Sequence, residues 1–182
     1  MRVLLLAVTL LATTGLLVAQ ESRMEVTKPT TPADDAKANS DSIPDVYALN
    51  GQFERVVVLR FKYQADLLAG MEKIIKEQNI RNAVILAGAG SLTGYHFHLV
   101  SNRTFPSRNI FIKNPSTSAD LVSMNGYIID GRIHAHITLT NENKAFGGHL
   151  ESGTTVFTFA IVTVGIFKDG IDLRRIDDKT YR

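Results

Sequence analysis

Hydrophobic residues recur along the middle of the chain with two different spacings. Between residues 67 and 75 they return at helical spacing, with charged residues between them, and Asp66 stands directly before them as a candidate N-cap. The apolar positions of this predicted helix are Leu67, Leu68, Met71, Ile74 and Ile75. We expect the helix to end near Asn79.

Short runs rich in β-branched and apolar residues predict strands elsewhere. These runs cover residues 55–61, 83–87, 109–113, 121–129, 132–140 and 154–167. The sequence GAGS at residues 88–91 is expected to make a tight turn into a further strand. Because the connections leave little room for parallel crossovers, the pattern predicts an α+β domain, with one main helix packed on a largely antiparallel sheet.

The two ends of the chain differ in composition from its middle. Residues 3–18 are apolar apart from three threonines and a glycine, and they end at Ala19, which predicts a secretory signal peptide over residues 1–19. An uncleaved membrane anchor is the alternative. Residues 20–45 are polar and are expected to form a disordered linker before a domain at residues 46–170 and a tail at 171–182. Cleavage would leave a secreted or periplasmic protein without a membrane anchor.

Charge and cysteine content narrow the classes of function. The formal net charge is +2 and the charged residues are spread along the chain, which does not provide the basic stripe of a nucleic-acid-binding surface. The sequence has no cysteine. It therefore excludes disulfides and thiolate metal sites, and it leaves histidine and carboxylate side chains as the candidate ligands.

Three of the five histidines fall in one short stretch, HAHITLTNENKAFGGHL. Because side chains alternate along a strand, His134 and His136 lie on the same face, with α-carbons about 6.6 Å apart. A chain reversal at residues 141–144 would bring His149 beside them. Three neutral imidazoles suit Zn²⁺ and leave one position open, as in a catalytic or ligand-binding site. Glu151 is a candidate fourth ligand or proton-transfer group.

Other interpretations of these histidines remain open. The pair on the strand is also compatible with a solvated face or with a hydrogen-bonded network that holds no metal. His96 and His98 show the same alternation, with Tyr95 and Phe97 on the opposite face. We interpret them as surface or pocket-wall residues, since no further histidine or cysteine lies near them in the sequence.

The order of these segments resembles the PPC domain, which plants and prokaryotes share. The resemblance covers residues 54–167 and is carried by the helix with the following glycine–serine segment, by Asn125-Gly126, and above all by HAH and GGHL. It implies a layered α/β domain that assembles as a homotrimer and is distantly related to the zinc enzyme acetolactate decarboxylase. It also implies that His134, His136 and His149 are metal ligands.

Departures from the family pattern separate two functional classes. Plant members carry AT-hooks that bind the minor groove of DNA, and this chain has none. Ile161 stands where many prokaryotic members have an acidic residue, and a secretory leader is unusual. The first class is an exported trimer that binds or acts on a small oxygen-rich molecule, as a zinc-dependent lyase or hydrolase would. The second is a non-catalytic trimeric assembly module, related to the DNA-binding members of the family, in which the histidines are unmetallated or structural.

Overall fold

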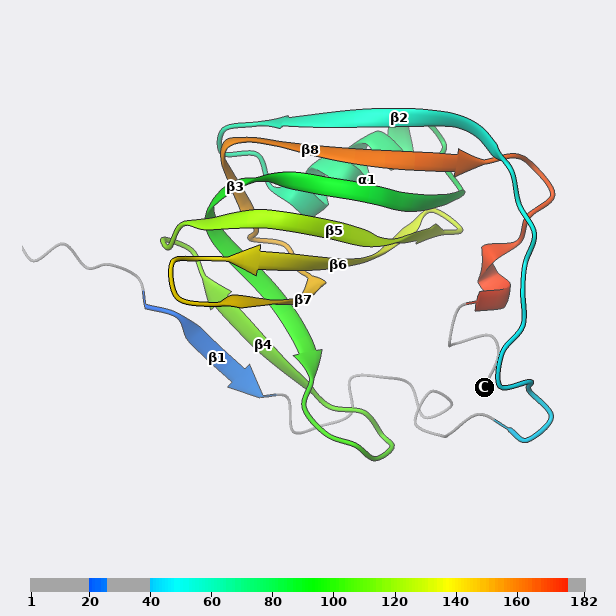
Figure 1. Cartoon of the computed structure of the whole chain (residues 1–182), viewed down its shortest axis with the longest axis horizontal. Helices are drawn as coiled ribbons and strands as arrows, with labels where there is room; N and C mark the ends of the chain where they lie inside the picture. Colours follow the sequence, from blue (N-terminus) through cyan, green and yellow to red (C-terminus); the bar gives the residue numbers. More distant parts are fainter. Residues whose placement is uncertain (1–19, 26–39, 177–182) are drawn as a thin grey trace, which may run out of the picture.

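Eight strands make one antiparallel sheet in the described part of the chain, and one α-helix packs on it (Figure 1). The structure is a computed structural model that describes residues 20–25 and 40–176. Its elements are β1 (Ser22–Glu25), β2 (Phe53–Lys62), α1 (Leu67–Glu77), β3 (Asn82–Val100), β4 (Asn109–Asn114), β5 (Ala119–Ile129), β6 (Arg132–Thr140), β7 (Ala145–Leu150), β8 (Thr155–Phe167) and the 3₁₀ helix η2 (Leu173–Ile176). The predicted antiparallel sheet with one main helix is confirmed. The predicted leader, residues 1–19, lies outside the described residues.

The helix α1 begins and ends where the sequence predicts. Asp66 is its N-cap and accepts a hydrogen bond of 2.8 Å from the backbone N–H of Ala69. Asn79, two residues beyond α1, has a φ of 49°, a left-handed conformation that asparagine tolerates well. The buried side chains of the helix are Leu67, Met71 and Ile75. Their burial in the hydrophobic core holds α1 behind β8 and β3, as Figure 1 shows.

Strand β3 runs through the segment for which we predicted a turn, and that prediction is wrong. It is one strand of 19 residues, paired with β5 and β8 along its first part. A Cβ at Gly88 would lie 2.5 Å from the Cβ of Met124, and one at Gly90 would lie 2.6 Å from the backbone of Ala160. The two glycines therefore serve the close approach of neighbouring strands rather than a change of direction.

Four strands close into a ring because β3 is long enough to pair twice. Beyond its pairing with β5, its residues Phe97 and His98 pair with Leu150 and His149 of β7. Strand β5 pairs with β6, and β6 pairs with β7. The hydrogen-bonded path from β3 through β5, β6 and β7 thus returns to β3. Alternation along β6 turns its apolar side chains to the core and its histidines outward.

Ordered elements extend beyond the predicted domain limits of residues 46 and 170. β1 lies within the predicted linker and pairs with β4, while the neighbouring Glu21 accepts a hydrogen bond of 2.5 Å from the Tyr95 hydroxyl. Within the predicted tail, η2 buries Leu173. A short, mostly polar segment can add to a free strand edge through its backbone alone, so the composition of β1 does not predict a strand.

No helix among residues 20–25 and 40–176 has the length and apolar character needed to cross a lipid bilayer.

Candidate metal centre

The hairpin of β6 and β7 places His149 directly opposite His136. The reversal between the two strands is held by Asn141, whose Oδ1 accepts hydrogen bonds from the backbone N–H groups of Asn143 (2.9 Å) and Lys144 (3.0 Å). Asparagine favours such turns because its short side chain can bind the backbone two residues ahead. The predicted reversal is therefore present, and it returns the chain to the histidine pair.

Three imidazoles meet on the outer face of this hairpin. The ring centroids of His134 and His149 are 4.9 Å apart, those of His136 and His149 are 5.3 Å apart, and those of His134 and His136 are also 5.3 Å apart. Each ring offers a nitrogen that lies within 4.8 Å of the other two. Two nitrogens bound to one tetrahedral Zn²⁺ are about 3.4 Å apart, so modest side-chain rotations suffice to bring the three onto one ion.

The surroundings of His136 and His149 favour the neutral form of both imidazoles. Burial, followed by repulsion from His98, His134 and His136 when these are protonated, lowers the pKa of His149 from 6.5 to about 4. The pKa of His136 is lowered too, first by burial and then by His134 and His98. Because only the neutral ring has a lone pair for a metal ion, these shifts favour the ligand form at neutral pH.

A fourth histidine, His98, adjoins this group in space, although it lies far from the other three along the chain. His98 is the partner of His149 in the β3–β7 pairing, and the two rings stack with centroids 4.6 Å apart and planes 30° apart. No other histidine beyond His96 is near His98 in the sequence, but His149 adjoins it in the structure. Its alternation with Phe97 was visible in the sequence, but only the closure of the ring of strands makes His98 a neighbour of His149.

The other polar side chains near the site have different partners. Among the described residues, the group of potential metal ligands contains only His134, His136 and His149. Glu151 faces His98 instead, with its Oε1 2.6 Å from Nδ1 of that ring. His96 makes a hydrogen bond of 2.7 Å with the carbonyl oxygen of Ser152 through its own Nδ1.

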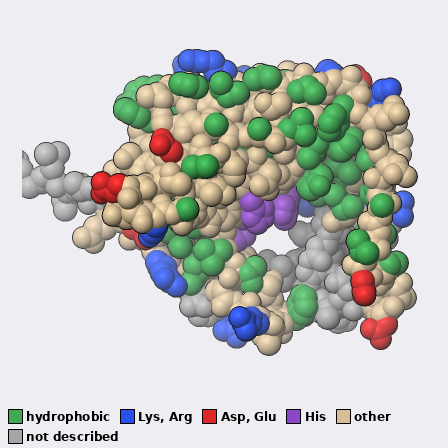
Figure 2. Space-filling view, viewed as in Figure 1, with side chains coloured by type: hydrophobic (Ala, Val, Ile, Leu, Met, Phe, Trp, Pro, Cys, Tyr) green, Lys and Arg blue, Asp and Glu red, His purple; other side chains and the backbone are tan. Residues whose placement is uncertain are grey.

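Exposed hydrophobic side chains lie on the outer face of strands β2 and β8. We call this surface the β2–β8 apolar face; it consists of Val56, Val58, Phe157, Phe159 and Ile161. These residues are 38% to 63% exposed, although apolar side chains of this size are usually buried. Figure 2 shows hydrophobic side chains and the group of histidines on the same side of the molecule.

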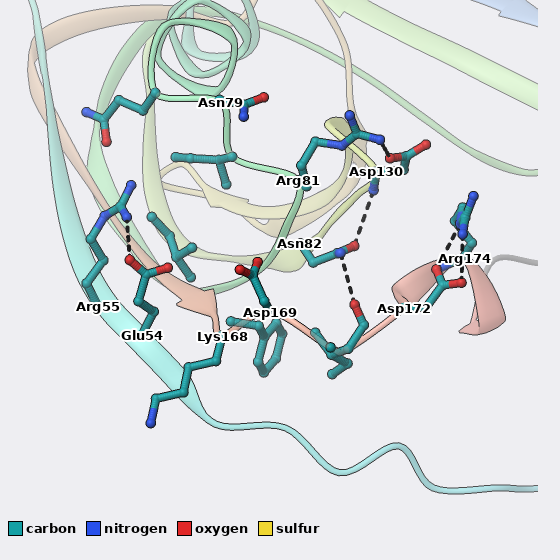
Figure 3. A pocket seen from close by; sticks show the side chains of 16 residues that line it. Glu54, Arg55, Asn79, Arg81, Asn82, Asp130, Lys168, Asp169, Asp172 and Arg174 are labelled. Atoms are coloured by element: carbon teal, nitrogen blue, oxygen red, sulfur yellow. Dashed lines mark hydrogen bonds and ion pairs between the residues drawn. The ribbon is translucent and has the colours of Figure 1, made fainter.

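A separate pocket of about 500 Å³ lies where α1 ends and β3 begins, and its walls carry mixed charge (Figure 3). Three basic side chains in its walls are paired with acidic ones, namely Arg55 with Glu54, Arg81 with Asp130 and Arg174 with Asp172. Such paired and exposed charges offer little net field to a charged ligand. The histidine group therefore remains the candidate functional site.

The fold and the site together define a β-rich domain with one helix and a candidate histidine metal centre on its outer face. A family model, the Plants and Prokaryotes Conserved (PCC) domain, matches residues 48–168. The chain belongs to this family, and the resemblance seen in the sequence is confirmed. No curated protein sequence matches the chain.

Solved structures of similar fold come from archaea and bacteria. A plant- and prokaryote-conserved protein of Pyrococcus horikoshii has a TM-score of 0.57 and 22% identity over 70% of this chain and 87% of its own. A metal-containing protein of Archaeoglobus fulgidus has a TM-score of 0.55 and 18% identity over 68% and 86%. A candidate DNA-binding protein of Bacteroides thetaiotaomicron has a TM-score of 0.52 and 17% identity over 65% and 82%. At these identities the likeness concerns the fold.

Proposed function

We propose that this protein binds one divalent metal ion through His134, His136 and His149 and presents it to a small oxygen-rich ligand. The observation that carries the proposal is the meeting of three imidazoles, each with a nitrogen within 4.8 Å of the others, on an outer face of the sheet. Zn²⁺ is the expected ion, because three neutral imidazoles with one open position match its preferred coordination. The metal-containing protein of Archaeoglobus fulgidus, which shares the fold, supports the proposal.

A zinc ion in this position would act as a Lewis acid toward an oxygen ligand or lower the pKa of a bound water. The chain's own contribution is to hold three rings on rigid paired strands and to favour the neutral form of His136 and His149. Two of the rings lie on the exposed side of β6, so a ligand can approach without a movement of the backbone. A lyase or hydrolase reaction on a small molecule fits this arrangement. The distant relation to acetolactate decarboxylase, which the sequence resemblance implies, agrees with such a reaction.

The alternative is a non-catalytic assembly module in which the same histidines are unmetallated or structural. Two observations favour it: Ile161 is apolar where an acidic residue was expected, and the Glu151 carboxylate is engaged with His98. The likeness to a candidate DNA-binding protein is compatible with this class. The chain's small net charge argues against DNA as the partner, and DNA binding would show a steep loss of affinity with added salt.

We also propose that three copies of the chain assemble through the β2–β8 apolar face. A second copy of the same chain would cover side chains such as Phe159 and Val58 and remove their apolar area from water. The assembly would act outside the cytoplasm, in line with the predicted cleavage after Ala19. Light scattering should give the mass of a trimer for the wild type. It should give the mass of a monomer for the double variant Val58→Glu, Phe159→Glu. Amino-terminal sequencing of exported protein should begin at Gln20.

Metal analysis tests the main proposal directly. Protein purified without a nickel column and dialysed against metal-free buffer should retain one zinc per chain. His136→Ala should lose it, whereas His96→Ala, which changes a histidine outside the group, should keep it. A wild-type protein that is folded, trimeric and empty after incubation with Zn²⁺ would overturn the metal proposal and leave the assembly module.

A further inference from the structure

One row of side chains crosses five paired strands on the outer face of the sheet. His98 of β3 is the direct partner of Phe111 of β4 on one side and of His149 of β7 on the other. The row continues from His149 to His136 of β6, and from His136 to Asn125 of β5. Direct partners in an antiparallel pairing have side chains within contact distance. His98 thus occupies the place next to the proposed ligand His149, on the side away from His136.

The ring of His98 is fixed by contacts from three directions. It stacks on His149 with centroids 4.6 Å apart, and its other neighbour in the row, the Phe111 ring, has its centroid 5.0 Å away. Glu151 holds the ring edge through the 2.6 Å contact between Oε1 and Nδ1. Both side chains of this pair are largely buried, with 20% and 27% of their surface exposed. These contacts fix the orientation in which the His98 ring faces His149.

His149 is the ligand that depends most on such support. It comes from β7, a strand of six residues, and it follows two glycines whose backbone has no side chains to restrict it. His134 and His136 are both carried by β6, which has nine residues and pairs with β5 along its whole length, whereas β7 pairs with β3 only through Leu150 and His149. The stacked ring of His98 covers one face of the His149 imidazole and limits its rotation about the Cα–Cβ and Cβ–Cγ bonds.

We infer that His98, oriented by Glu151, is a positioning residue that holds the His149 imidazole in the orientation needed to bind the metal ion. This inference rests on the metal site proposed above. His98 is not itself a fourth ligand, because its ring nitrogens do not belong to the group of nitrogens that lie close together. Side chains that orient metal ligands commonly change metal affinity by about 10- to 100-fold when removed.

Two matched variants separate the stacked ring from the polar contact. His98→Phe keeps an aromatic ring beside His149 and removes Nδ1, whereas His98→Asn keeps a donor toward Glu151 and removes the ring. The zinc dissociation constant of each is measured by competition with a chromophoric chelator, and thermal unfolding of the metal-free proteins checks the fold. His96→Ala is the control, since His96 lies on the same strand and face with a different partner.

We expect His98→Asn and His98→Ala to raise the dissociation constant about 10- to 100-fold, while His98→Phe stays within about fivefold of the wild type. The absorption spectrum of the Co²⁺ protein should change in His98→Asn, because the His149 nitrogen loses its fixed direction. Stoichiometric zinc binding that is equally tight in all His98 variants would overturn the inference and leave the metal site intact. A wild-type protein without zinc would overturn both.

Discussion

One carboxylate oxygen of Asp66 accepts a hydrogen bond of 2.6 Å from the backbone N–H of Gly153, while its other oxygen caps α1 through the N–H of Ala69. Gly153 belongs to the connection between β7 and β8, directly after Glu151 and Ser152. A single side chain therefore ties the start of the helix to the segment that carries Glu151 toward His98.

Asp66→Ala should lower the free energy of unfolding by about 1–3 kcal/mol, because both the N-cap and the bond to Gly153 are lost. Asp66→Asn keeps an oxygen acceptor and should lose less. Urea unfolding of the two variants and the wild type measures the difference. An Asp66→Ala protein within about 0.5 kcal/mol of the wild type would contradict the assigned role.

Acid should destabilise the metal-free protein through His149. Its pKa is about 4 in the folded chain and 6.5 when unperturbed, so between these values the unfolded chain binds a proton at this residue and the folded chain does not. The free energy of unfolding therefore decreases as pH falls from about 6.5 to about 4. The free energy of unfolding, measured at several pH values, should change less with pH in His149→Gln than in the wild type. An identical pH dependence would show that His149 is not responsible.

Zinc should stabilise the fold if it binds only the folded chain. At a free concentration of 100 times the dissociation constant, the expected gain in the free energy of unfolding is about 2.7 kcal/mol. A chelator such as EDTA should reverse the gain, and His136→Ala should show none. The melting temperature with and without Zn²⁺ provides the measurement, and an unchanged wild-type value at saturating zinc would refute the prediction.

Gly148→Ala should weaken both the fold and the metal site. A Cβ at Gly148 would overlap the backbone carbonyl oxygen of His98, so β7 would have to move away from β3. We expect a loss of about 1–3 kcal/mol in stability together with weaker zinc binding. The control is Gly170→Ala, where a Cβ meets no atom within 4 Å: backbone strain is added at its φ of 101°, but zinc affinity should not change.

Alkaline pH should weaken the contact that holds the first strand. Burial, together with the hydrogen bond to Glu21, raises the pKa of Tyr95 from 10 to about 12. The folded chain therefore keeps the phenol proton that the unfolded chain loses, and stability falls as pH rises from about 10 to about 12. Spectrophotometric titration should show one tyrosine ionising late in the wild type and earlier in Glu21→Ala. A wild-type curve without a late tyrosine would contradict this.

Local pattern was sufficient to predict most of the fold. The helix, its cap at Asp66 and the strand Arg132–Thr140 follow from spacing and from side chains that act over a few residues. The glycines at 88 and 90 misled because the same residue type serves turns and close strand packing, and only the identity of the neighbouring strands distinguishes the two. Strand β1 was missed since its order comes from the edge of β4 and not from its own composition.

The candidate site also contains residues that local sequence predicts and one residue that depends on the topology of the sheet. His134, His136 and His149 belong to one hairpin, so alternation and a turn signal were enough to predict that they meet. His98 lies 51 positions before His149, and its approach depends on the second pairing of β3. Contacts across such separations are properties of the topology, which no short stretch of sequence contains.

The ring of strands has a practical consequence for the turn at Asn141. β7 is aligned once by β6 and again by β3, so a slip of one residue, which would turn His149 into the core, is opposed from two sides. The position of the imidazole therefore depends less on residues 141–144 than it would in a hairpin that pairs along one edge only. A substitution in this loop, which four paired residues of β6 separate from His136, is therefore expected to leave the histidines in register.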